Sequence, residues 1–406
     1  MVGLSFSAGT IIQALIALND ETYVPQQWHG TLLVIAAVAL AIGVNILVSK
    51  HMPVVQSVLL ILHVAGVLAV IVPLLVMAPR KNSARTAFVE LANGGGWLSN
   101  GSAMMIGLLA PLSSLMGYDC AVHMCKFHSL FSPTRRSIIM FYLLDTDIGF
   151  VILAEEIRDA SRTLPSAILW SVLLNVVLGY IAVLTLVFTL PAPATLLTEG
   201  VTFPMLPYFL STTGSLAATN SFAAIIIVIL ICAVIAEIAT ASRQVWAFSR
   251  DNGFPFSKFL STVNPRHPIP MNAIIVSFVF GVIISLVNLG SSVALNAIIS
   301  LTISALLGSY ILSIGCLLSK RFRGEEMPKA RWSLGKAGLW VNLAAMAFLL
   351  PFFIFCFFPI AKGPSPQTMN WDSVMFGGIM VLATVWYVVR GRKIYTPPVR
   401  LVKRDL

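Results

Sequence analysis

The sequence predicts an all-α fold, a polytopic membrane protein built as a bundle of helices. Hydrophobic residues occupy 58% of its 406 positions, charged residues occupy 10%, and the mean hydropathy is +0.90. A soluble core cannot absorb that much apolar surface. The apolar residues also gather in runs of about 17 to 25, the length that crosses a hydrocarbon core of about 30 Å as a helix.

Ten such runs follow one another along the chain, and eight of them contain no Asp, Glu, Lys or Arg. In order, they are Met1–Asn19, Thr31–Ser49, Val54–Met77, Ala103–Met124, Ser166–Leu190, Asn220–Thr240, Met271–Leu289, Ser292–Ser319, Leu339–Ile360 and Ser373–Val389. We therefore expect one bundle of about ten spans over residues 1–390, followed by a short tail at residues 391–406.

The net charge of +10 reflects topology rather than nucleic-acid binding. Lys and Arg collect in alternate loops, the bias that places basic loops on the cytoplasmic side of a membrane. With the C-terminus inside, the cytoplasmic positives include Lys50, Arg158, Arg162, the loop from Arg243 to Arg266, the cluster Lys320 to Lys336 and the tail from Arg390. The positives placed outside are Arg80, Lys81, Arg85 and Lys362. We expect a multi-pass protein with a cytoplasmic C-terminus and no nucleic-acid partner.

The segment from Cys125 to Leu153 does not fit this pattern. Its second half is apolar but carries Asp145 and Asp147, and each would cost about 2.5 to 3.5 kcal/mol at the centre of a bilayer. If the segment spanned, every later basic loop would change sides. We therefore interpret residues 125–153 as an atypical insertion and not as an eleventh helix.

Cofactor and enzyme chemistry lack a sequence signal. The five cysteines are scattered, and the chain has neither a CxxC array nor an HExxH motif. No nucleophile or metal constellation stands out, so we expect no metal, no cofactor and no enzymatic activity.

Asp119 is the more informative of two acids that lie within predicted spans. Pro111, Ser113, Ser114 and Gly117 precede it, and these residue types weaken a helix inside a membrane. A broken helix is tolerated there only where it lines a cavity, and its freed backbone groups then bind polar solutes. The alternative is a kinked helix whose acid reaches the cytoplasmic edge.

Glu237 is the second acid. An ionisable residue inside a membrane helix is a functional candidate because it needs a partner or a cavity. Glu237 lies only about one turn before Ser242 and Arg243, however, so simple hydration at the interface is an open alternative.

Several motifs resemble those of the fungal amino acid and choline permeases of the amino acid-polyamine-organocation superfamily. The stretches that carry the likeness are GYDCAVHM, AEEIRDASRTLPSAILWSVLLN, ATASRQVWAFSRDNGFPFSKFLSTVNP, IPMNAIIVS, GSSVALNAIISL, RWSLGKAGLWVN and TMNWDSVMFGG. The resemblance implies a LeuT-like inverted-repeat helix bundle in the plasma membrane. By that likeness Ala103–Met124 is the sixth helix, and the chain lacks the family's first two helices.

The family pattern also continues directly from His123 and Met124 into a small residue and then Glu-Glu-Ile. This chain instead inserts residues 125–153 before its own Glu155 and Glu156. Codons for Cys-Lys-Phe can contain a splice donor and codons for Leu-Ala an acceptor, and removal of the intervening bases restores the family pattern in frame. We hypothesise that the insertion is a translated intron.

The resemblance implies secondary active transport of a small nitrogenous solute, an amino acid, 4-aminobutyrate or choline, coupled to protons. The expected substrate-binding residues are Ser114, Gly117, Tyr118 and Asp119, and the expected proton-coupling residues are Asp119 and Glu237. Two alternatives stay open: a transport-incompetent fragment or the product of a wrongly delimited gene, and a nutrient sensor that retains the permease fold.

Overall fold

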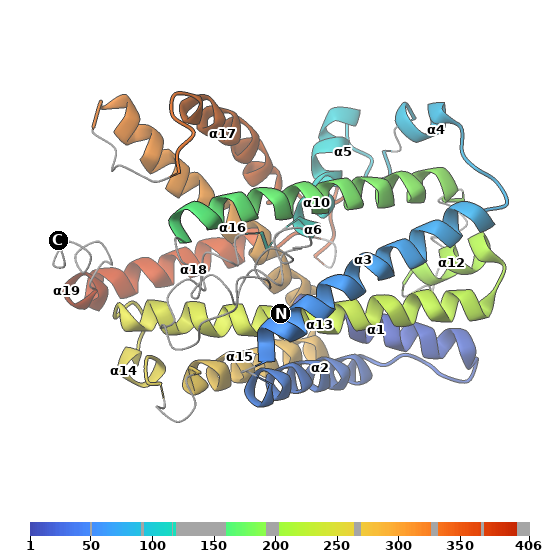
Figure 1. Ribbon diagram of the computed structural model, residues 1–406, viewed down its shortest axis with the longest axis horizontal. Coiled ribbons are helices and arrows are strands. Elements are labelled where there is room, and N and C mark those ends of the chain that lie inside the picture. The colour runs from blue at the N-terminus through green and yellow to red at the C-terminus, as the bar shows by residue number, and fades with distance from the viewer. Residues whose placement is uncertain are drawn as a thin grey trace.

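The structure is a computed structural model, and every element it describes is helical (Figure 1). It describes residues 1–48, 51–90, 93–115, 117–118, 160–191, 203–263, 269–325, 332–366 and 369–395. These ranges contain no strand, so the all-α prediction is confirmed for them.

Nine helices within the described ranges are long and apolar enough to cross a membrane. They are α1 (Val2–Asn19), α2 (Gln27–Leu47), α3 (Met52–Met77), α10 (Ala160–Thr189), α13 (Leu216–Arg250), α15 (Met271–Gly290), α16 (Ser292–Phe322), α17 (Ala337–Phe355) and α18 (Asp372–Trp386). The shorter elements are α4 (Ala84–Phe88), α5 (Asn100–Gly107), α6 (Leu109–Ser114), α12 (Met205–Thr213), α14 (Ser257–Leu260), the π-helix η2 (Tyr387–Gly391) and α19 (Arg392–Ile394). The chain is thus a polytopic helical membrane protein, as predicted.

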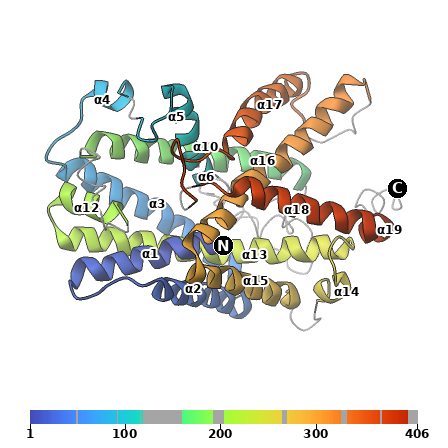
Figure 2. The same ribbon diagram turned by 180° about the vertical axis from the view of Figure 1, so that it is seen from behind.

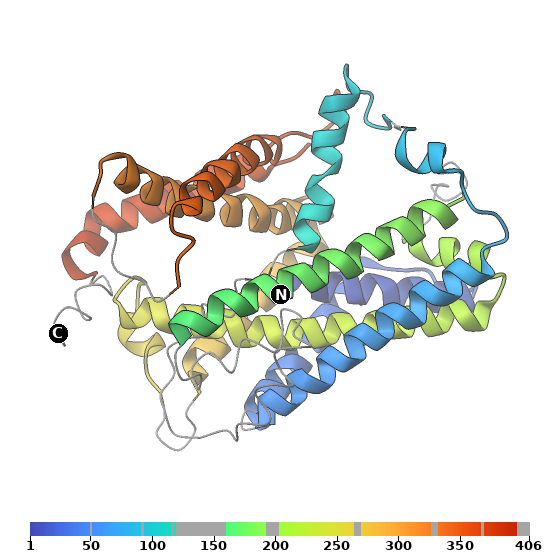
Figure 3. The same ribbon diagram turned by 45° about the horizontal axis from the view of Figure 1, so that its top comes forward.

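The predicted span Ala103–Met124 is not among these nine, and part of it lies outside the described residues. Its described part forms α5 and α6, which are separated at Leu108. Pro111 accounts for the irregularity, because it has no N–H to donate to the carbonyl of Gly107 one turn earlier. Figure 3 shows α5, in cyan, leading toward the middle of the molecule, where α6 ends.

Serine side chains start several of the helices. Ser215 precedes α13 and its hydroxyl accepts from the N–H of Ala218 at 3.3 Å, while Ser291 precedes α16 and accepts from Ala294 at 3.2 Å. These hydroxyls satisfy backbone donors that the first turn leaves without a helical partner. The last predicted span also runs further than expected, since η2 and α19 continue its helical course from Val389 to Ile394.

Helix α13 is the central element of the bundle and packs against α1, α2, α3, α12 and α15. Its 35 residues correspond to a length of about 52 Å, well beyond a hydrocarbon core of about 30 Å. Val234, Ile235 and Ile238 form a buried cluster with Val34 and Val38 of α2. This buried cluster lies between the first two spans and the middle of α13.

A second group of helices forms around α16, which packs against α15, α17 and α18. Leu307 of α16 and Phe352 of α17 are buried together, and Leu109 and Leu112 of α6 pack onto them. Figure 2 shows α17 and α18 on the side of the molecule away from α3 and α12. Helix α16 thus connects the first group to α6, α17 and α18.

Asparagine side chains join helices across the core. The Asn45 amide of α2 donates to the backbone carbonyl of Ile235 on α13 at 2.8 Å, and Asn288 of α15 donates to the Thr31 hydroxyl of α2 at 3.2 Å. Such bonds contribute to helix association where lipid supplies no hydrophobic driving force.

We predict that Asn45→Ala lowers the free energy of unfolding by about 1 kcal/mol, because the buried α2–α13 bond is lost. The measurement is a denaturation titration of the purified protein in detergent micelles. Asn19→Ala is the matched control, since Asn19 pairs with Asn220 at an exposed position, and its effect should stay below about 0.5 kcal/mol. Equal losses from the two variants would contradict this account of the core.

Candidate functional site

The end of α6 combines a stopped helix with a glycine in an unusual conformation. The hydroxyls of Ser113 and Ser114 fold back onto the carbonyls of Ala110 and Pro111, each at 2.7 Å. Gly117 then adopts φ 112°, a region that residues with a side chain rarely occupy. The α-helix therefore ends at Ser114 inside an otherwise apolar run, and the N–H of Leu115 donates to the carbonyl of Leu112 at 3.3 Å in a tighter last turn.

Tyr118 follows directly and stacks on Tyr310 of α16. Their ring centroids are 6.0 Å apart and their planes differ by 13°. The contact is consistent with the packing nearby, where Leu112 of α6 packs against the cluster that contains Leu307, one turn before Tyr310 on α16. Helix α16 therefore positions the aromatic pair beside the interrupted backbone.

This arrangement suits a small solute with a positive group and a polar end. Aromatic faces attract cations through the negative potential of the ring, and backbone carbonyls at a helix end accept hydrogen bonds. Ser114 is exposed, and Gly117 and Tyr118 are half-buried, so the same short stretch offers a hydroxyl, backbone groups and a ring.

Asp119 lies outside the described residues. Of the four predicted substrate-binding residues, the structure therefore brings Ser114, Gly117 and Tyr118 to one place and says nothing of the fourth.

Glu237 lies in a different environment, on α13. Its carboxylate forms an ion pair with the amino group of Met1, and 39% of the Glu237 side chain is exposed. The partner of Glu237 is thus at the start of the first helix, whereas Tyr118 lies against α16. Asp119, the other predicted proton-coupling residue, lies outside the described residues.

Two features of this region were not predicted from the sequence. Tyr310 gives no local signal, because its stacking on Tyr118 is a tertiary contact between distant segments. The second is Asp372, which lies one residue before the span predicted to start at Ser373 and is the first residue of α18. Its side chain is only 1% exposed and accepts a hydrogen bond from the Ser304 hydroxyl at 3.0 Å. A turn signal was available at Asn370, whose side-chain oxygen accepts from the Asp372 N–H at 3.1 Å just before α18.

A metal site has no support in the part of the chain that the structure describes. No three His, Cys, Asp or Glu side chains come together there in a way that would hold a metal ion.

Comparison with known proteins gives one family. A family model described as amino acid permease matches residues 1–144 and 137–381. A choline transporter of Saccharomyces cerevisiae is 25% identical over 390 residues, which is 96% of this chain and 63% of that protein. Amino-acid permease 2 of Neurospora crassa is 26% identical over 395 residues, 97% of this chain and 67% of that protein.

A Schizosaccharomyces pombe protein named as an uncharacterized amino-acid permease is similar to the same degree. It is 25% identical over 397 residues, 97% of this chain and 67% of that protein. The chain thus spans 63 to 67% of the length of these relatives.

We predict that Tyr118 and Tyr310 are energetically coupled by about 0.5 to 1.5 kcal/mol, the usual worth of a stacked aromatic pair. The measurement is a double-mutant cycle of unfolding free energies with Tyr118→Leu and Tyr310→Leu. A cycle between Tyr118 and Tyr208 is the control and should give a coupling near zero, since Tyr208 packs in another cluster with Phe209 and Phe222. If the coupling energy of Tyr118 with Tyr310 is no larger than that of Tyr118 with Tyr208, the two stacked rings do not stabilise each other.

Proposed function

Because the chain belongs to the amino acid permease family, we propose that it carries a small nitrogenous solute across a membrane by secondary active transport. The multi-pass helical architecture supports this proposal. The solute is an amino acid, 4-aminobutyrate or choline, since the relatives are named for amino acids and choline. All three candidates carry a positively charged nitrogen.

The observation that carries the proposal is the interrupted helix at Ser114 beside the Tyr118–Tyr310 stack. An ammonium group placed against an aromatic face gains about 0.5 to 2 kcal/mol, more when water is excluded. In this proposal the backbone at the end of α6 and the Ser114 hydroxyl bind the polar end of the solute, and Gly117 adopts its positive φ just after that point.

Asp119 supplies the negative charge that offsets the ammonium or carries the coupled proton. This assignment rests on its position directly after Tyr118 and on the cost of an unpaired acid within a membrane. Glu237 takes part in proton coupling from α13. Transport proceeds by alternating access, in the plasma membrane, with the basic C-terminal tail on the cytoplasmic side.

Residues 125–153 are not part of the working transporter in this proposal, and they lie outside the described residues. The family match divides at this insertion, since its two segments, residues 1–144 and 137–381, overlap inside it. Replacement of Cys125 to Ala154 by a single serine restores the family's sequence at this point.

Uptake of radiolabelled choline, 4-aminobutyrate and amino acids by a permease-deficient fungal strain tests the proposal. The chain as printed is compared with the version that carries serine in place of Cys125 to Ala154. We expect uptake of at least one of these solutes by the serine version. Solute binding without uptake would support a sensor instead, and equal uptake by both versions would contradict the intron hypothesis.

For the transported solute, Tyr118→Leu should raise the half-saturation concentration about 3- to 10-fold, as loss of a cation–π contact implies. Tyr118→Phe is the matched control, because it keeps the ring and should change the value less than about twofold. Concentration-dependent uptake measures both. If leucine and phenylalanine have equal effects, the ring does not contact the ammonium.

Asp119→Asn should reduce uptake about tenfold or more at unchanged surface expression, since a charge-assisted contact is worth about 1.5 to 3 kcal/mol. Surface expression is measured by biotinylation in the same cells. Uptake that stays at the parent level would remove Asp119 from the mechanism. Asp251→Asn is the control, because Asp251 pairs with Arg250 just after the end of α13.

A further inference from the structure

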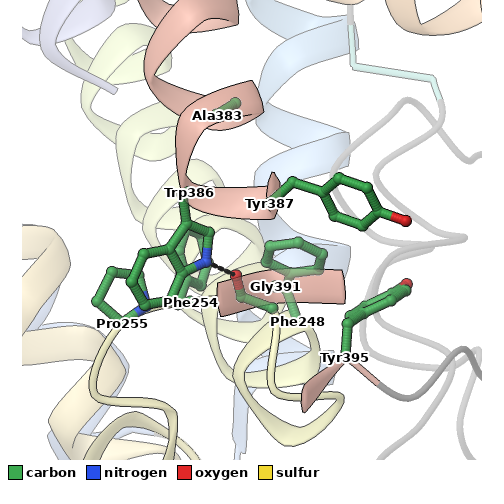
Figure 4. Close-up of a pocket in the computed structure, with 9 residues that line it drawn as sticks. Phe248, Phe254, Pro255, Ala383, Trp386, Tyr387, Gly391 and Tyr395 are labelled. Atoms are coloured by element: carbon green, nitrogen blue, oxygen red, sulfur yellow. Dashed lines mark hydrogen bonds between the residues drawn. The ribbon is translucent and has the colours of Figure 1, made fainter. Parts of the chain in front are cut away.

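A pocket of about 380 Å³ lies where the C-terminal end of α13 meets the C-terminal end of α18 (Figure 4). Its walls are largely aromatic and come from α13, the turn that follows it, α18, η2 and the residue after α19. The lining residues that matter here are Phe248, Phe254, Pro255, Trp386, Tyr387 and Tyr395.

The turn after α13 builds one wall. Asn252 adopts φ 59°, and the N–H of Gly253 donates to the carbonyl of Phe248 at 2.9 Å, which is the pattern of a helix ended by a left-handed residue. This turn brings Phe254 onto the edge of Phe248, with ring centroids 4.8 Å apart and planes at 87°. A Cβ on Gly253 would lie only 2.4 Å from the Phe248 ring, so this wall requires glycine.

The π-helix η2 builds the facing wall. Trp386, just before η2, donates its indole N–H to the carbonyl of Gly253 at 3.0 Å and ties the two walls together. A Cβ on Gly391 would lie 3.3 Å from the Tyr387 ring, so glycine lets that ring lie close over the helix. Single π-turns of this kind occur frequently at functional sites.

From the extents of the two apolar spans that meet there, we expect the pocket at the boundary between hydrocarbon and water. Trp386, Tyr387 and Gly391, which line the pocket, belong to the last part of the apolar span that runs from α18 through η2 and α19 to Ile394. On α13, Phe248 is eight residues beyond Thr240, the end of the apolar run, and therefore about 12 Å further along the helix. Exposed Phe254 and Tyr387 are suited to this zone, where aromatic rings are enriched.

The segment that lines the pocket from Tyr387 to Tyr395 carries only positive charges. Arg390, Arg392 and Lys393 are exposed on η2 and α19, and the stretch from Tyr387 to Tyr395 contains no acid. Asp251, on the turn after α13, is paired with Arg250 at 3.6 Å. An apolar pocket beside three cations fits a molecule with an apolar chain and an anionic head, and it disfavours a free cation.

We propose that this pocket binds an anionic phospholipid. Part of an acyl chain lies among the aromatic rings, and the phosphate and its anionic head contact Arg390, Arg392 and Lys393. Basic residues at the end of a membrane helix attract anionic headgroups, and the aromatic pocket adds a defined place for the chain. The site is distinct from the proposed solute site at Ser114 to Tyr118, and it does not depend on which solute is carried.

Quenching of Trp386 fluorescence by brominated lipids tests the proposal with the full chain in lipid nanodiscs. The chain contains eight tryptophans, so the contribution of Trp386 is the difference between the parent and Trp386→Phe. The probes are phosphatidylserine and phosphatidylcholine with dibrominated acyl chains. We expect half-maximal quenching of Trp386 at an about tenfold lower mole fraction of phosphatidylserine.

Charge variants decide what causes the preference. Arg390→Gln/Arg392→Gln/Lys393→Gln should abolish it, whereas Arg390→Lys/Arg392→Lys should keep it, because the charges remain. The matched control is Lys320→Gln/Arg321→Gln/Arg323→Gln, which removes three cations at the end of α16 and should leave the preference intact.

Three results would overturn the proposal. They are equal quenching by the two lipids, a preference that survives the neutralised triple variant, and the absence of Trp386 quenching by either lipid, which would mean that protein covers the pocket. Since no uptake is measured, such a failure would leave the proposed transport function unaffected.

Discussion

The packing of α13 against its neighbours is the constraint on which the rest of the structure depends. Helices in lipid gain little from the hydrophobic effect between them, so close packing and interhelical hydrogen bonds hold them together. The buried alanines Ala236 and Ala239 allow neighbours to approach, and the Asn45 amide bonds the α13 backbone. Because α13 extends beyond the membrane core, the same helix that organises the bundle also carries Phe248 to the aromatic pocket.

Helix α16 links the helices around α13 to the candidate solute site. It contacts the first group through α15, and it then presents Tyr310 to Tyr118 and Ser304 to Asp372. The interruption at the end of α6 is therefore supported from outside its own segment. A helix end inside a membrane is costly unless neighbours or a cavity satisfy it, and this cost is one reason why we propose that the solute binds at Ser114.

The sequence predicted what depends on local composition. Apolar runs located the nine spans, since length and hydropathy decide whether a helix can cross a bilayer, but α13 continues to Arg250, well past the predicted end at Thr240. Pro111 and Gly117 marked the weak point of the fourth run. It did not predict the Tyr118–Tyr310 stack or the pocket between α13 and α18, because these join segments that only tertiary packing brings together. Asp372 was missed for a smaller reason: the predicted boundary fell one residue after it.

The most direct test of the central claim, that the stopped helix at Ser114 contacts the solute, is protection of an introduced thiol. In a background without the five native cysteines, Ser114→Cys is labelled with a membrane-impermeant maleimide in the presence and absence of saturating solute. The account predicts that solute slows labelling at Ser114→Cys and leaves Asn100→Cys, at the exposed start of α5, unchanged. Labelling of Ser114→Cys at the same rate with and without a solute that the protein carries would contradict it.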